Sequence, residues 1–288
     1  MAEAAKTLFI PEVVAAGIEK RLDAEWKLVA LCNRKYEGDI KNQGDKVKIR
    51  TVSPITAHAL TRDAVRTKIE AAEELNGEMK MLNIDQIAYT NTKVDSIDEL
   101  ATDVSLMDAT TKEMAIALAQ YHDTYIANLV KGLTDEKYVL KNGTSNWSVT
   151  KSNAVDFVMA GVTALREANV PESSPLALVI SPKVYAELVK AGIVDKTDNT
   201  AIYTNGYVGK VLGVDLVMSN NLATDADGVT YAFIAVKDKA IAFAQQISKV
   251  IHYRDDSNEL DADFIKSYSL FGAKILFPDY MRVLPIAK

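Results

Sequence analysis

Residues 53–80 form a polar stretch that constrains the fold more than any other part of this 288-residue chain. The stretch, SPITAHALTRDAVRTKIEAAEELNGEMK, is rich in charge and has few large apolar side chains, so it cannot build a hydrophobic core of its own. Strand patterns flank it: residues 46–52 alternate basic and apolar side chains, and residues 81–95 are strand-like. The sequence therefore predicts an extended loop or long hairpin here, with a flexible surface insertion as the alternative.

A long helix follows this excursion. The sequence SIDE at 96–99 is a capping box, which is typical of a helix start. From 105 to 131 a predicted apolar stripe recurs every three or four residues: Met107, Thr111, Met114, Leu118, Tyr121, Tyr125 and Leu129. A helix over this range is about 40 Å long at about 1.5 Å per residue, and Gly132 is a plausible end. Such a helix is better suited to a strut than to a small core.

The remaining segments read as an N-terminal arm and an alternating α/β region. Helical spacing of apolar residues runs from Val13 to Trp26. Beyond the turn-rich residues 141–147, the patterns predict helices over 152–168 and 182–190, and strands over 176–181, 214–218, 231–236, 240–244, 247–253 and 264–277. The final MRVLPIAK is apolar enough to return to a core.

Composition and charge exclude several classes of protein. The chain has 48% hydrophobic residues but no apolar run near the roughly 18–20 residues that a membrane span needs, and its start lacks a secretory pattern. With 33 basic and 39 acidic residues the net charge is −6, which argues against tight binding of nucleic acid. Cys32 is the single cysteine, so no intramolecular disulfide is expected, in keeping with a reducing cytoplasm.

The sequence offers no catalytic or metal-binding pattern. His58, His122 and His252 are far apart and lack metal-ligand spacing, so structural roles are predicted for them. The acidic stretches 225–228 and 255–263 do not fit a calcium loop. We therefore expect a protein that is not an enzyme and needs no cofactor and no metal.

Three glycines in NGYVGKVLGVDLVMSNNL raise the question of a nucleotide site. Gly206, Gly209 and Gly213 follow the spacing G-x-x-G-x-x-x-G, not the dinucleotide fingerprint G-x-G-x-x-G. The β-branched residues 214–218 predict a strand after them, so no helix N-terminus is available to hold a phosphate. A chain turn is therefore favoured over a nucleotide site.

The same stretch resembles a segment of tailed-phage major capsid proteins of the Hong Kong 97-type fold, in the coat-protein branch found in short-tailed phages. Further segments agree in order: Phe9-Ile10-Pro11, Tyr36-Glu37-Gly38, Gly44-Asp45-Lys46-Val47, Ile84-Asp85-Gln86, Val94-Asp95, and Val179-Ile180-Ser181-Pro182 before Tyr185. Each motif is weak alone, and the resemblance rests on their order and spacing over nearly the whole chain.

The resemblance implies an α+β fold with five segments. These are an N-terminal arm (1–40), strands with the extended loop (41–95), a peripheral domain with the spine helix (96–150), an axial α/β domain (151–246) and a return to the peripheral domain (247–288). The excursion at about 52–83 would then lie across a neighbouring subunit, which would supply the contacts that it lacks.

The implied function is a self-assembling coat protein whose icosahedral shell encloses a double-stranded DNA genome without binding it tightly. Candidate interface residues, some chosen because opposite charges should meet between subunits, are Phe9, Trp26, Arg62, Arg66, Lys68, Glu73, Glu74, Asp98, Glu99 and Asp103. The implied partners are further copies in pentamers and hexamers, with portal, scaffolding and decoration proteins as candidates. The implied location is the virion capsid, assembled in the bacterial cytoplasm. The alternatives are an encapsulin-type shell that houses cargo and, from another class, a cytosolic nucleotide-dependent enzyme.

Overall fold

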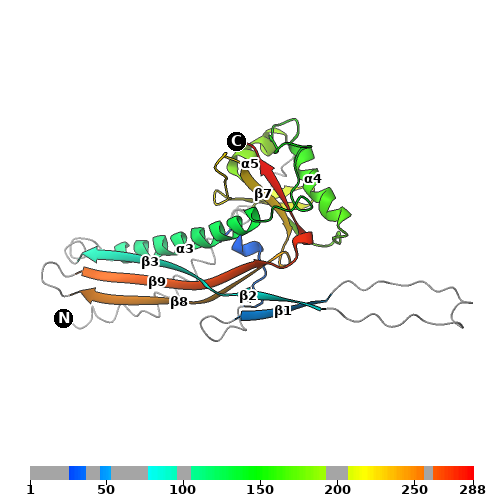
Figure 1. Cartoon of the computed structure of the whole chain (residues 1–288). Coiled ribbons are helices and arrows are strands. Elements are labelled where there is room, and N and C mark those ends of the chain that lie inside the picture. Colours follow the sequence, from blue (N-terminus) through cyan, green and yellow to red (C-terminus); the bar gives the residue numbers. More distant parts are fainter. Residues whose placement is uncertain (1–25, 37–45, 53–76, 96–104, 193–206, 256–261) are drawn as a thin grey trace, which may run out of the picture.

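The computed structural model describes residues 26–36, 46–52, 77–95, 105–192, 207–255 and 262–288. Within these ranges the chain has an elongated part, in which a long helix lies along a long sheet, and a compact part with a second sheet and two helices (Figure 1). A two-stranded hairpin projects from the region between them. The α+β class that the sequence predicted is confirmed.

The elongated part is a three-stranded antiparallel sheet in the order β3–β9–β8. Its strands are β3 (Gln86–Asp95), β8 (Ile241–Asp255) and β9 (Ala262–Ile275). The separate strands predicted at 240–244 and 247–253 were wrong, because β8 is one continuous strand. Its pairing with β9 shifts register between Gln246 and Ser248. The apolar pattern of the sequence breaks at this irregularity, although the strand continues through it.

Helix α3 (Ser105–Lys131) lies along one face of this sheet and has the predicted bounds (Figure 1). The predicted stripe was wrong at Tyr121, which is 50% exposed, whereas Tyr125 and Leu129 pack half-buried against the core and the unpredicted His122 and Asp123 are buried. Steps of three and of four residues both stay on one side of a helix, so Tyr121 and His122 were equally allowed after Leu118. The buried face follows steps of four, to His122, Ile126 and Val130. The rings of Tyr121 and Tyr125 instead pack by their edges against Phe271 of β9.

The projecting hairpin consists of β1 (Lys46–Val52) and β2 (Gly77–Asn83), which pair antiparallel from Lys46–Asn83 to Val52–Gly77. The predicted pair of strands around the excursion is thus confirmed, although residues 53–76 lie outside the described part. The single strand expected over 81–95 was wrong, because β2 pairs with β1 and β3 pairs with β9.

A glycine on β9 lets the chain change partners between β2 and β3. A Cβ atom on Gly272 would lie 2.1 Å from the backbone oxygen of Asn83, a distance that no side chain tolerates. The hairpin therefore crosses the face of the long sheet in direct backbone contact with β9. Below the hairpin, Val47, Ile49 and Leu82 pack with residues of β8 and with Leu276.

The compact part is a five-stranded sheet in the order β10–β7–β4–β6–β5, in which only the β4–β6 pair is parallel. The bounds are β4 (Leu176–Ile180), β5 (Tyr207–Val211), β6 (Val214–Met218), β7 (Thr230–Val236) and β10 (Met281–Ile286). Every residue of β4 is buried, as expected for a strand covered on both faces.

Two helices cover one face of this sheet. Helices α4 (Ala154–Glu167) and α5 (Pro182–Lys190) share a core with Leu176, Leu178 and Ile180 of β4. On the other face, Val179 belongs to the core that contains α3. The hydrophobic cores of the two parts therefore meet across β4.

The C-terminal residues are divided between the two sheets. Strand β9 lies in the long sheet, whereas β10, which follows the short 3₁₀ helix η5 (Pro278–Tyr280), pairs with β7 in the compact sheet. The division of the chain at 247–288, expected as a return to the peripheral domain, stays a prediction. Its six residues are all buried, so the predicted return of the apolar tail to a core is confirmed.

Candidate functional site

Most of the predicted interface residues lie outside the described part of the chain. These are Phe9, Arg62, Arg66, Lys68, Glu73, Glu74, Asp98, Glu99 and Asp103. The exception is Trp26, the first residue that the structure describes. Its side chain is only 2% exposed within its own subunit, so it has little surface to offer to a neighbour.

Trp26 instead begins a short segment that fastens to α3, and we call residues 26–33 the arm root. The indole Nε1–H of Trp26 donates a hydrogen bond of 3.3 Å to Nδ1 of His122. The indole also meets the ring of Phe243 edge-on, with centroids 5.7 Å apart. The arm root continues into the 3₁₀ helix η1 (Val29–Leu31) and then bonds to the start of β8 through Asn33.

Asp123 holds the arm root through its carboxylate. Oδ2 accepts the backbone N–H of Lys27 at 3.1 Å, and Oδ1 accepts those of Leu28 and Val29 at 3.0 and 3.2 Å. These are the N–H groups at the start of η1, where a negative charge is favourable. Burial raises the pKa of Asp123, while these N–H groups and the side chain of Asn221 lower it. The carboxylate therefore joins α3 to the arm root and to the segment after β6.

His122 occupies the centre of the same region. Its Nε2 lies 3.2 Å from Oγ of Ser269, and its ring packs against Phe271 with centroids 4.5 Å apart. Because Nδ1 accepts from Trp26, the ring proton is on Nε2 and points to Ser269. Burial lowers the pKa of His122 to about 4, so the ring is neutral near pH 7. The structural role predicted for His122 is thus confirmed.

Sequence reasoning missed Asp123 as an anchor. A signal was present, since Asp123 falls four residues after Ala119 and four before Ala127, both of which are buried on α3. A carboxylate on a buried helix face requires partners. Nothing in the sequence indicated that these partners were backbone groups more than ninety residues away.

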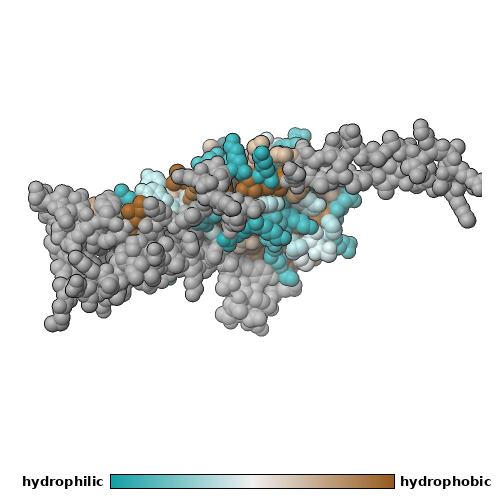
Figure 2. All heavy atoms as spheres, turned by 90° about the horizontal axis from the view of Figure 1, so that it is seen from below, coloured by the Kyte–Doolittle hydropathy of each residue, from teal (hydrophilic) through white to brown (hydrophobic). Residues whose placement is uncertain are grey.

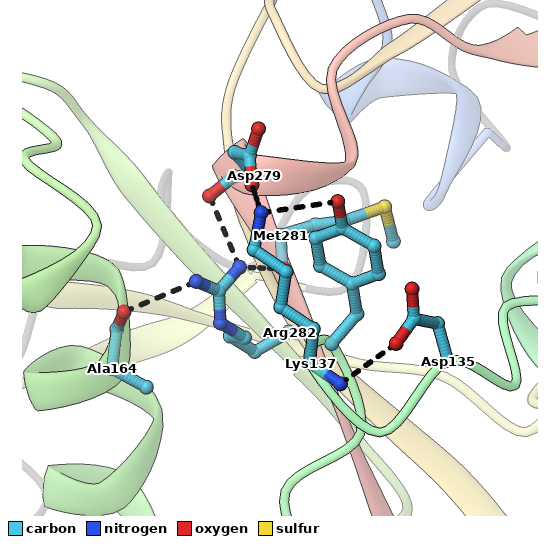
Figure 3. A network of polar contacts seen from close by, with 7 residues as sticks. Asp135, Lys137, Ala164, Asp279, Met281 and Arg282 are labelled. Carbon is cyan, nitrogen blue, oxygen red and sulfur yellow. Dashed lines mark hydrogen bonds and ion pairs between the residues drawn. The ribbon is translucent and has the colours of Figure 1, made fainter.

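A second polar network joins the end of the long helix to the compact part (Figure 3). The guanidinium of Arg282, a residue only 4% exposed, donates to the backbone oxygens of Asp279 and Met281, and to that of Ala164 on α4. Lys137, in the segment after α3, forms an ion pair of 2.7 Å with Asp279. These contacts tie α4, β10 and the segment after α3 together.

An exposed face runs along β2 and β3. Every odd-numbered residue from Met79 to Lys93 is exposed, and none of the even-numbered residues between them is. We call these odd-numbered residues the open face. It includes Ile87 and Tyr89, which are 52% and 68% exposed. The ring of Tyr89 lies beside that of Tyr268 on β9, with centroids 6.4 Å apart.

The open face of β3 points away from α3, because the intervening Ala88 packs in the core that contains that helix. Figure 2 views the molecule from below; among the residues coloured there, hydrophobic and hydrophilic ones are interspersed. The large apolar side chains of the open face are Met79, Met81, Ile87 and Tyr89, with Asn83 and Asp85 between the two pairs. Exposed apolar side chains grouped in this way are typical of a surface that another protein covers.

Gly213 lies in a chain turn, as the sequence favoured, whereas Gly209 lies within strand β5 (Tyr207–Val211), where the pairing with β6 is irregular. Gly206 lies outside the described residues, but Leu212 and Gly213 have φ of 52° and 80° and connect the antiparallel strands β5 and β6. Two consecutive residues with positive φ are typical of a tight β-hairpin turn. The strand β5 itself was not predicted.

The described residues contain no group of three or more histidine, cysteine, aspartate or glutamate side chains placed to hold a metal ion. Among the described helices, none is long and apolar enough to cross a membrane.

The long helix on a long sheet, the projecting hairpin and the compact α/β part define a subunit of the Hong Kong 97-type capsid fold. The model of the phage capsid protein family matches residues 89–285, and the chain belongs to this family. A structure from Mycobacterium phage Che8 is 27% identical with a TM-score of 0.65, and the match covers 88% of each chain. The predicted family is confirmed.

Two more distant structures share the fold. The capsid of Ralstonia phage GP4 is 14% identical with a TM-score of 0.65, over 93% of this chain and 91% of that one. A virus-like particle from Pyrococcus furiosus is 15% identical with a TM-score of 0.57, over 95% and 98%. The search of curated proteins found no match.

Proposed function

We propose that this chain is the major capsid protein of a tailed phage and that its copies form the icosahedral shell around a double-stranded DNA genome. The observation that carries the proposal is the open face on a chain of the phage capsid family. A monomer would leave Ile87 and Tyr89 in water, whereas burying each would contribute about 1–2 kcal/mol per contact. Repetition of such contacts around a shell makes it stable even where each is weak.

The neighbour's excursion, residues 53–76, is the occupant that we propose for the open face. In the sequence it connects β1 to β2, the two strands of the projecting hairpin (Figure 1). Its acidic half, with Glu73 and Glu74, suits the end of the open face that carries Lys93. Its basic half, with Arg62 and Arg66, would meet the acidic residues 98–103 that precede α3.

The finer features of the proposal follow from the family resemblance. Pentamers and hexamers form the shell, and portal, scaffolding and decoration proteins are the further partners. Assembly takes place in the bacterial cytoplasm, and the shell encloses DNA without a tight binding site, in keeping with a net charge of −6. The chain acts as a structural protein with no catalytic role.

An encapsulin-type shell is the second candidate, because the virus-like particle from Pyrococcus furiosus has a similar fold. The two candidates differ in what the particle holds. Nuclease-protected DNA in particles isolated from the source would support the phage capsid, whereas a stoichiometric protein cargo would support the encapsulin.

Changing Ile87 and Tyr89 to aspartate tests the proposal. The double variant should melt like the unchanged subunit, since both side chains are largely exposed in the subunit alone. It should form few shells in sedimentation velocity and electron microscopy, because charge cannot be buried at the contact. The matched control, Ile87→Val with Tyr89→Phe, keeps the apolar surface and should assemble. Normal assembly of the aspartate variant would refute the role of the open face.

A further inference from the structure

The two ring nitrogens of His122 are both committed in the subunit. Nδ1 accepts the indole N–H of Trp26, and Nε2 donates to Oγ of Ser269. A second proton can therefore be added only at Nδ1. The indole N–H is a donor without any acceptor capacity, so a protonated ring would place two donors against each other.

We propose that His122 makes the arm root acid-sensitive: a second proton on its ring displaces Trp26 and releases the arm root from α3. Trp26 packs against His122 and Phe243, and the next three amides bond to the carboxylate of Asp123. The later residues of the arm root are held separately, since Val29 and Cys32 are buried in the core and Asn33 bonds to β8. The release therefore begins at Trp26 and extends to the amides of residues 27–29, which open to water when the indole leaves.

Among the described groups around His122, none offers an acceptor to the Nδ1–H of the imidazolium, whereas its Nε2–H still has Oγ of Ser269. From β8 and β9 it faces the rings of Phe243 and Phe271 and the hydroxyl of Ser269. Directly after the arm root, Arg34 places its cation 4.5 Å from the centre of the Trp26 ring, and within the arm root Cys32 is a buried thiol.

The remaining titratable neighbours are on α3 and in the turn after β7. On α3, Tyr121 and Tyr125 turn their rings to Phe271, and Asp123 directs both carboxylate oxygens to the arm-root amides. Asp238 donates its backbone N–H to Leu31 and lies in the turn before β8.

The sign of the pH effect follows from the two states of His122. Burial lowers the pKa of His122 to about 4 in the closed state, against 6.5 for a solvated ring. The released state therefore binds the proton more tightly, and release becomes more favourable as the pH falls from 6.5 towards 4. The pKa of Asp123 is raised, so its protonation has the opposite sign and favours the closed state in acid.

Hydrogen exchange of unassembled subunits at pH 7 and pH 4, corrected for intrinsic exchange rates, tests the proposal. Protection of the amides of residues 27–29 should fall by up to about 100-fold between these pH values, which is the ratio that His122 pKa values of 6.5 and about 4 imply, and protonation of Asp123 reduces the fall. The amides of β4, which is buried on both faces, exchange by global unfolding and should stay better protected than residues 27–29 at pH 4. Residues 27–29 as well protected as β4 at pH 4 would mean exchange by global unfolding alone and would overturn the proposal, as would no loss at residues 27–29.

Three variants separate this mechanism from a purely structural role. In His122→Gln the amide can accept from Trp26 and donate to Ser269 but does not titrate, so the fall should be less than about 5-fold. Trp26→Phe removes the opposing donor, and its pH dependence should also be smaller. His252→Gln, a matched change on β8, should behave like the unchanged chain. A 100-fold fall retained in His122→Gln would overturn the proposal.

Discussion

Asp123→Ala removes the acceptor of three consecutive backbone N–H groups in the arm root. The bonds from Lys27, Leu28 and Val29 are 3.0–3.2 Å long, and the carboxylate residue is 1% exposed. A buried donor left without a partner costs about 1–3 kcal/mol, and removing the buried charge offsets part of the sum. We expect a loss of about 3 kcal/mol in the free energy of unfolding, a large share of the roughly 5–15 kcal/mol typical of a folded protein.

Urea unfolding of unassembled subunits at pH 7, followed by circular dichroism, measures this loss. Asp123→Asn is the control, because its Oδ1 can still accept from Leu28 and Val29, and only the bond to Lys27 is lost. It should cost about 1 kcal/mol. Hydrogen exchange should locate the defect of both variants at residues 27–29. An alanine variant that unfolds at the same urea concentration as the unchanged subunit would refute the anchoring role.

Three further predictions follow from particular contacts. Gly272→Ala should lose several kcal/mol of stability or fail to fold, since its Cβ would lie 2.1 Å from the backbone oxygen of Asn83; thermal melting beside Ala273→Ser checks this. The Arg62→Glu and Arg66→Glu double variant should melt normally but assemble poorly, and about 1 M salt should weaken assembly of the unchanged chain in the same way in light scattering. As the pH falls from 6.5 to about 4, the unfolded chain protonates His122 while the folded subunit keeps it neutral, so the free energy of unfolding should fall by up to about 3 kcal/mol. Urea titrations of His122→Gln should show no such fall.

Local sequence patterns predicted the elements well where one periodicity dominates. The bounds of α3 and α5 and of strand β6 agree with the sequence, because one periodicity of apolar residues runs through each, and Pro182 marks the start of α5. The errors lie where pairing decides. Strands β2 and β3 follow each other in one strand-like stretch and are separated only because they pair with different strands. Strand β8 continues through a register shift, and in the sequence such a shift looks the same as the end of a strand.

The candidate site was predicted less completely than the fold. Trp26 was predicted to lie at a subunit interface, whereas its contacts in the structure are inside the subunit, where His122 on α3 accepts its indole N–H. Asp123 was missed since its ligands are backbone amides, which carry no sequence signal. The open face is visible in the sequence only as alternation, and alternation alone does not say which side lacks a cover.

Electron microscopy of the purified chain tests the central claim most directly. If the chain is the shell subunit, concentrated protein at low salt should form closed particles of uniform size with five-fold vertices. The Ile87→Asp and Tyr89→Asp variant should remain as small oligomers or monomers under the same conditions. If the unchanged chain, with its open face intact, stays a folded monomer at every protein and salt concentration, the account is contradicted.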